Sequence, residues 1–174
     1  GSGKHINFSL QDSEGRNLLK PSSNHRKNVI FHSFLSSFVM GVADYSGLLH
    51  ASVSTPGNMY RRGGHEAPPS IISVYLGQAI DRIIREIEDG NCDGDMPAKN
   101  TMDIGLSKLP EIIAFDSDRN RTSPIAFTGN KFEFRAPGAS QAMAVPVTAI
   151  LSVWAAGLEK FINIFEDRIN KGED

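Results

Sequence analysis

The sequence has little cysteine, because Cys92 is the single thiol in 174 residues. One thiol cannot form an internal disulfide, so a disulfide framework is excluded and a reducing compartment is favoured. The sequence also lacks an excess of positive charge, since 18 lysines and arginines against 20 acidic residues give a formal net charge of −2. We therefore expect no general electrostatic attraction to nucleic acid.

Apolar runs as long as a membrane span are missing too, and no signal peptide opens the chain. We therefore expect a cytoplasmic protein without a membrane partner. The hydrophobic fraction of 40% and the charged fraction of 22% are ordinary for a globular chain. A starting methionine is absent, so the chain is interpreted as a fragment of a longer protein or as one with a cloning remnant at its first two residues.

The segment at 130–135, Asn-Lys-Phe-Glu-Phe-Arg, alternates as a half-buried strand does. Its two phenylalanines would face a hydrophobic core, and Glu133 would share the other face with Lys131 and Arg135. Opposite charges this near keep a carboxylate ionised, so Glu133 is a candidate ligand for a metal or a cationic substrate group. The alternative is a solvated sheet face whose charges only pair across strands.

A second alternating segment lies near the start of the chain, at 3–10. Apolar residues alternate there with His5, Asn7 and Ser9, which predicts a strand with an imidazole, an amide and a hydroxyl on one face. A histidine in this place is either a hydrogen-bonded residue of the sheet face or a metal ligand, and the segment alone leaves both open.

The remaining periodicity predicts helices and one further strand. Apolar residues at three- and four-residue spacing indicate a helix over 25–42 with a further helical stretch through 48–49, and a second helix over 78–88. A helical segment over 140–171 follows, with Ser140 as a plausible N-cap and Pro146 either ending a short helix or lying in the first turn of the next. An apolar strand is expected over 70–76, and a mobile acidic insertion over 89–101.

Two loops are rich in arginine. The loop at 58–69 contains two adjacent arginines and two glycines before His-Glu-Ala-Pro-Pro, and the segment at 118–124 contains two more arginines. Glycine lets the backbone approach a ligand closely, and the guanidinium group suits carboxylates and phosphates. Each loop is either a binding loop or a solvated surface loop.

Taken together, these segments form a chemically coherent set. A histidine and a carboxylate on sheet faces can share a divalent cation with phosphate oxygens. Arginines can neutralise a transferring phosphoryl group and hold a carboxylate substrate, while a glycine-rich loop closes over the site. The sequence therefore favours ATP-driven activation of a carboxylate.

The motifs that carry this chemistry resemble those of the glutamine synthetases, and within them the large type III form. The matching motifs are Gly-Ser-Gly-Lys-His at 1–5, the loop 58–68 with its Glu-Ala-Pro, Arg-Asn-Arg at 119–121, and Lys-Phe-Glu-Phe-Arg at 131–135. They occur in the order of the family and span nearly the whole chain. The resemblance implies an α+β fold in which a curved, mainly antiparallel sheet packs against helices, with residues 1–174 forming part of a single catalytic domain.

The resemblance also implies how the site would bind ATP and its metal. His5 and Glu133 resemble the two ligands that this region gives to the metal, Mg²⁺ or Mn²⁺, at the ATP phosphates. Asn7 and Ser9 would lie along the nucleotide, and Lys131 would stand near its phosphates.

Further residues are implied to act on glutamate and ammonia. Gly1, Arg61 and Arg135 resemble the groups that hold the substrate amino acid, with the arginine next to Arg61 as the alternative. Arg121 resembles the arginine that stabilises the transferred phosphoryl group. Glu66 resembles the flap glutamate that closes the ammonium site and takes a proton as the amide forms.

The activity implied is the ligation of ammonia to L-glutamate through a γ-glutamyl phosphate, in a ring-shaped homo-oligomer with sites between subunits. Because other metal ligands of the family would lie before residue 1, we expect the 174-residue chain alone to show no turnover with ATP, glutamate and ammonium. The alternatives are a γ-glutamylamine ligase, a guanidino kinase, or a non-catalytic module with the same fold.

Overall fold

A four-stranded sheet forms the centre of the computed structural model, which describes residues 3–21, 28–67, 69–89, 101–102, 112–113 and 123–172. The strand order is β1-β6-β5-β2, with bounds of β1 (Ile6–Phe8), β6 (Phe132–Phe134), β5 (Ile125–Phe127) and β2 (Val74–Tyr75). Strands β1 and β5 run antiparallel to β6, whereas β2 runs parallel to β5. A separate two-stranded sheet pairs β3 (Thr101–Met102) with β4 (Ile112–Ile113).

Strand β6 has a core face and a polar face, as its alternation predicts. Phe132 and Phe134 are fully buried, whereas Glu133 between them is only partly buried. The ring of Phe132 lies 4.2 Å from that of Phe38 and 5.9 Å from that of Phe8, measured between ring centroids. The aromatic residues of both strands therefore pack onto the helices and leave the charged face of β6 outside the core.

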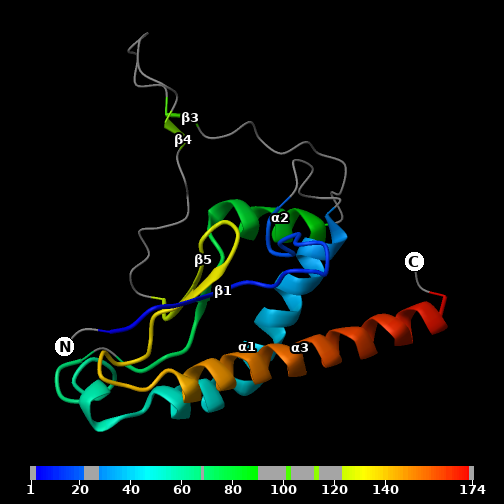
Figure 1. The fold of residues 1–174 in the computed structure, drawn as a ribbon. Coiled ribbons are helices and arrows are strands. Elements are labelled where there is room, and N and C mark those ends of the chain that lie inside the picture. The colour runs from blue at the N-terminus through cyan, green and yellow to red at the C-terminus, as the bar shows by residue number, and fades with distance from the viewer. Residues whose placement is uncertain are drawn as a thin grey trace.

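Three α-helices and one short 3₁₀ helix complete the described part: α1 (Val29–Val53), η2 (Pro56–Asn58), α2 (Gln78–Glu88) and α3 (Ala144–Asn170). Helix α1 begins where the side chain of Asn28 accepts a hydrogen bond from the backbone N–H of Phe31, which is an N-cap interaction. It ends just before Pro56, whose ring cannot continue a helix. In Figure 1, α1 and α3 cross side by side below the sheet.

The two long helices approach each other most closely at two glycines. A Cβ added to Gly157 would lie 2.0 Å from the carbonyl oxygen of Ser37, and one added to Gly41 would lie 2.2 Å from that of Val153. The buried indole of Trp154 in α3 stabilises the same contact, because its Nε1–H donates to the backbone oxygen of Phe34 in α1 at 3.2 Å. Glycine at these two positions is therefore a condition for the close approach of α1 and α3.

Several elements differ from the sequence-based expectation. Helix α2 has the predicted bounds, but the expected helix over 25–42 is α1, which begins at Val29 and continues to Val53 with a kink at Tyr45. Ser140 is not the N-cap of the last helix, since α3 begins at Ala144 and Pro146 lies in its first turn. Strand β5 was not predicted. Most of the expected insertion over 89–101 lies outside the described residues.

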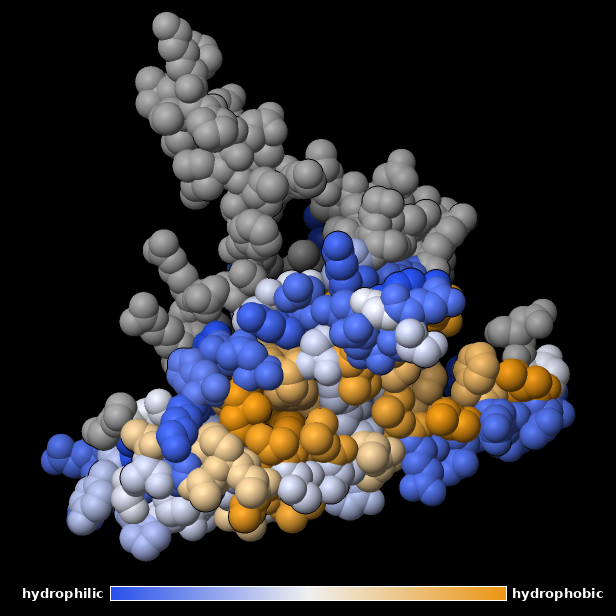
Figure 2. All heavy atoms as spheres, in the orientation of Figure 1, coloured by the Kyte–Doolittle hydropathy of each residue, from blue (hydrophilic) through white to orange (hydrophobic). Residues whose placement is uncertain are grey.

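Helix α3 also carries apolar residues away from α1. Its 27 residues are long and apolar enough to cross a membrane by length and composition, contrary to the expectation that no segment approaches that length. A core helix of a water-soluble protein passes the same test, so this property alone does not indicate a membrane. Figure 2 shows hydrophobic side chains along α3, and the exposed ones at Leu151, Ile162, Phe165 and Ile169 follow a spacing typical of helix packing.

The α1–α3 contact gives a stability prediction with a matched control. We expect Gly157→Ala to destabilise the protein by about 1–3 kcal/mol because the added methyl group meets backbone atoms that cannot yield. Gly47→Ala, in α1 but with nothing within 4 Å of the added Cβ, should instead stabilise the protein by about 0.5–1 kcal/mol through helix propensity. Urea unfolding of both variants measures the difference, and a stabilised Gly157→Ala would contradict the close approach.

Candidate active site

The polar faces of β1 and β6 form one surface. Antiparallel pairing places Asn7 opposite Glu133, so residues alternating with the core phenylalanines on both strands project to the same side of the sheet. Directly before the start of β1, the Nδ1 atom of His5 lies 2.8 Å from Oε1 of Glu133. The structure thus joins the two residues that the sequence proposed as metal ligands, although 128 positions separate them along the chain.

Arg135 completes a charged cluster around the same carboxylate. Its Nε–H donates to Oε2 of Glu133 at 2.6 Å, and both side chains are largely buried. Burial by itself raises the pKa of Glu133, but the hydrogen bond and charge of Arg135, with a smaller contribution from His5, hold that pKa below its usual value. The carboxylate therefore stays ionised at neutral pH.

This cluster suits part of a divalent cation site. A half-exposed imidazole and an ionised carboxylate supply nitrogen and oxygen donors of the kind that Mg²⁺ and Mn²⁺ accept in proteins. No group of three or more histidine, cysteine or acidic side chains that could hold a metal occurs in the part of the chain that the structure describes. The donors present fit a shared site to which further ligands would come from elsewhere.

Arg61 lies next to this cluster and is bound to the backbone. One of its terminal nitrogens, Nη1, donates to Oδ1 of Asn58 at 2.9 Å and to the backbone oxygen of Pro137 at 3.1 Å. The guanidinium also fills the space beside Gly3, where an added Cβ would lie 2.3 Å from Nη2. Arg61 therefore ties the loop after α1 to the end of β6 and to the residues before β1.

Asn58 is the buried centre of these contacts. Its Nδ2 donates to the backbone oxygens of Val53 at 2.7 Å and of Ala136 at 2.9 Å, and its own backbone oxygen accepts from the N–H groups of the two following arginines. The sequence alone did not mark this residue as functional. Its place directly after Thr-Pro-Gly, where a helix must end, is the signal that could have marked it.

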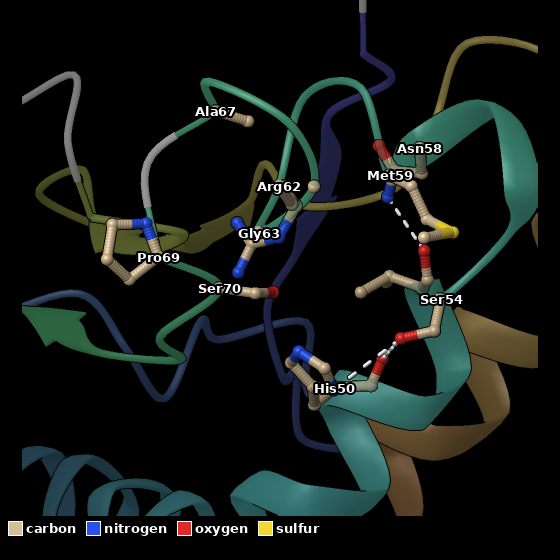
Figure 3. A pocket seen from close by; sticks show the side chains of 11 residues that line it. His50, Ser54, Asn58, Met59, Arg62, Gly63, Ala67, Pro69 and Ser70 are labelled. Carbon is tan, nitrogen blue, oxygen red and sulfur yellow. Dashed lines mark hydrogen bonds between the residues drawn. The ribbon is translucent and has the colours of Figure 1, made fainter.

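A cavity of about 610 Å³ opens on the other side of the same loop, between the loop and the end of α1. Figure 3 shows Arg62 in the hollow, across from His50 of α1 and from Ser54 directly after this helix. The guanidinium donates to the backbone oxygen of Ile71 at 3.0 Å, while its buried Nε has no hydrogen-bond partner among the residues that the structure describes. Burial, and then the charge of Arg61, lower the pKa of Arg62. Arg62 is thus a half-buried cation that faces a cavity.

The loop also carries Glu66, which is exposed. Its neighbour His65 has φ of 52°, in the left-handed region, and stacks on Tyr60 with ring centroids 5.0 Å apart and planes 2° apart. None of the contacts within the described ranges joins Glu66 to the His5–Glu133 pair. The flap role of Glu66 stays a prediction.

The remaining predicted residues lie further from the cluster or outside the described part. Ser9 donates to Oδ1 of Asn17 at 2.7 Å and to the backbone oxygen of Asn130 at 3.2 Å. Lys131 is exposed in the turn between β5 and β6. Gly1 and Arg121 fall outside the described residues, so their predicted roles stay predictions.

Comparisons with known proteins show what this chain is similar to. No protein-family model matches the sequence. The chain is 46% identical over 158 residues to the type-3 glutamine synthetase of Dictyostelium discoideum, which covers 91% of this chain and 21% of that protein. It is 40% identical over 181 aligned residues to a glutamine synthetase of Bacteroides fragilis, covering 99% of this chain and 25% of the other. The chain is a relative of the glutamine synthetases.

A third curated relative, the glutamine synthetase of Butyrivibrio fibrisolvens, is 41% identical over 133 residues. The chain spans about a fifth to a quarter of the length of the three proteins. The resemblance deduced from the motifs is thereby confirmed, the type III form included. The structure adds the mixed α/β fold with a four-stranded sheet and helices, and the curved sheet type implied by the glutamine synthetase resemblance stays a prediction.

The contacts of Asn58 give a prediction for this glutamine synthetase relative. Asn58→Ala leaves the backbone oxygens of Val53 and Ala136 without this donor and takes an acceptor from Arg61, so we expect a loss of about 1–3 kcal/mol in the free energy of unfolding. Asn163→Ala, on the exposed surface of α3, should change it by less than about 0.5 kcal/mol. Urea unfolding measures both, and equal effects would show that the Asn58 bonds are dispensable.

Proposed function

We propose that a full-length protein containing this chain ligates ammonia to L-glutamate, with ATP as the energy source, and gives L-glutamine. The observation that carries the proposal is the cluster of His5, Glu133 and Arg135 on one sheet face, in a chain 40–46% identical to glutamine synthetases. The reaction has two steps: ATP phosphorylates the side-chain carboxylate of glutamate, and ammonia then displaces the phosphate.

The charged cluster suits the phosphoryl transfer. His5 and Glu133 would hold a divalent cation, which supplies charge neutralisation at the phosphate oxygens. Arg135 keeps Glu133 ionised and in place through the 2.6 Å hydrogen bond. Asn7, Ser9 and Lys131 belong to the same two strands and the adjoining turns, and we assign them to the nucleotide as the resemblance implies. Arg121 is assigned to the transferred phosphoryl group on the same basis.

The loop after α1 suits the amino-acid substrate. Of its two arginines, Arg61 donates to backbone oxygens away from the cavity, whereas Arg62 donates to that of Ile71 and lines the cavity, with an Nε that has no hydrogen-bond partner among the described residues. We therefore assign substrate binding to Arg62 together with Arg135, and a supporting role to Arg61. Gly1 is assigned to the substrate as well. A guanidinium in a cavity binds a carboxylate strongly, because little water competes for it there.

Glu66 would close the ammonium site and accept the proton that ammonia loses as the amide forms. Exclusion of water matters at this stage, because water would hydrolyse the acyl phosphate. We place the enzyme in the cytoplasm, as a ring-shaped homo-oligomer with sites between subunits. Parts of the full-length protein outside this chain would provide the ligands that complete the metal site.

The proposal is tested on the full-length protein by measuring glutamine and phosphate formed from ATP, glutamate and ammonium. Glu133→Gln removes the charge that holds the cation, and we expect activity to fall by about 100-fold or more. Glu159→Gln on the exposed surface of α3 serves as the control and should retain activity.

Metal-dependent ATP binding, measured by calorimetry, should be lost in Glu133→Gln and kept in the control. Wild-type protein that binds ATP but forms product only from an alkylamine or a guanidino compound would replace this proposal with one of the related activities. Protein that neither binds ATP nor turns over would indicate a non-catalytic module.

A further inference from the structure

We propose that the Tyr60–His65 stack is a positioning device that holds Glu66 in the conformation needed for the ammonia step. This inference rests on the proposed function and adds two residues to it. The stack joins the beginning of the glycine turn to the residue directly before Glu66, with ring centroids 5.0 Å apart and planes 2° apart.

The backbone around the stack forms a tight turn. The N–H of Gly64 donates to the oxygen of Met59 at 3.1 Å, and the N–H of Ala67 donates to the oxygen of Gly64 at 2.9 Å. A Cβ at Gly64 would lie 2.7 Å from the oxygen of Met59, so the turn closes only with glycine there. Closing the turn is what brings the rings of Tyr60 and His65 face to face.

The conformation of His65 requires support. It is the one residue other than glycine with positive φ in the described ranges, and at 52° a side chain with a Cβ is disfavoured. Stacking on Tyr60 is an interaction that His65 makes in this conformation, and it therefore favours this conformation. Since the backbone of His65 sets where the next residue begins, the stack also determines the direction in which Glu66 leaves the loop.

The stack is not part of the hydrophobic core. Both rings are exposed, and neither belongs to the hydrophobic core cluster found among the described residues. Its removal should therefore alter the population of the positioned loop without unfolding the protein. An exposed aromatic pair of this kind shifts such a population by about 2- to 10-fold.

The test uses the full-length enzyme and follows ammonium and ATP kinetics separately. Tyr60→Ala should lower kcat/KM for ammonium by about 2- to 10-fold, with KM for ATP and the thermal unfolding midpoint unchanged. Tyr60→Phe keeps the ring and should restore most of the wild-type value. Tyr45→Ala removes another exposed tyrosine, on α1, and should have no effect on ammonium kinetics.

His65→Asn tolerates positive φ but removes the ring, so it should reproduce the effect of Tyr60→Ala. The two substitutions together should cost little more than either alone, because both remove the same contact. Additive losses, or equal losses in Tyr60→Phe and Tyr60→Ala, would overturn the inference.

Hydrogen exchange separates this inference from the proposed function. Exchange of the amides of Gly64 and Ala67 should be about 2- to 10-fold faster in Tyr60→Ala than in Tyr60→Phe, whether or not the protein has ligase activity. If the wild-type protein has no ligase activity but the two variants show this exchange difference, the proposed function is contradicted. The role of the stack in positioning the loop then stands. Unchanged exchange together with unchanged ammonium kinetics would contradict the positioning role alone.

Discussion

The site depends on one strand pairing, between β1 and β6. Because side chains alternate along a strand, the register that sets Asn7 opposite Glu133 also sends the phenylalanines of both strands into the core. A shift of one residue would bury Glu133 and expose Phe132 and Phe134, which the packing against Phe38 and Trp154 does not allow. Burial of aromatic surface therefore fixes the position of the charged cluster, and the chemistry of one face relies on the packing of the other.

The loop after α1 shows a similar division between support and chemistry. Asn58 and Arg61 donate hydrogen bonds to backbone oxygens of α1 and of the residues after β6. These bonds fix the beginning of the loop to the sheet. Arg62 faces the cavity instead. Adjacent arginines point to different surroundings because the chain turns between them, with both of their N–H groups bonded to the backbone oxygen of Asn58. Arg61 thus anchors the loop, and Arg62 lines the cavity where we propose that a ligand binds.

Much of this could be predicted from the sequence, and the limits have physical causes. Alternation identified the strands of His5 and Glu133, since one face of each is buried, and the helical period gave α2 with its bounds. Strand β5 was missed because all of Ile125–Phe127 is buried, so no alternation marks it. The contact between His5 and Glu133 depends on long-range pairing that no local pattern specifies. The hydrogen bonds that the side chain of Asn58 donates to backbone oxygens cannot be predicted from the sequence either, because every residue has a backbone oxygen.

In the enzyme that we propose, the stack of Tyr60 on His65 would leave a short loop mobile enough to close and ordered enough to place the carboxylate of Glu66. A loop held by core burial would open too slowly to admit ammonia in each turnover, whereas a loop of glycines alone would hold Glu66 in many directions. An exposed ring pair lies between these limits, because it stabilises one conformation by an amount that thermal motion can overcome. The glycines give the turn its shape, and the rings select among the conformations that the glycines permit.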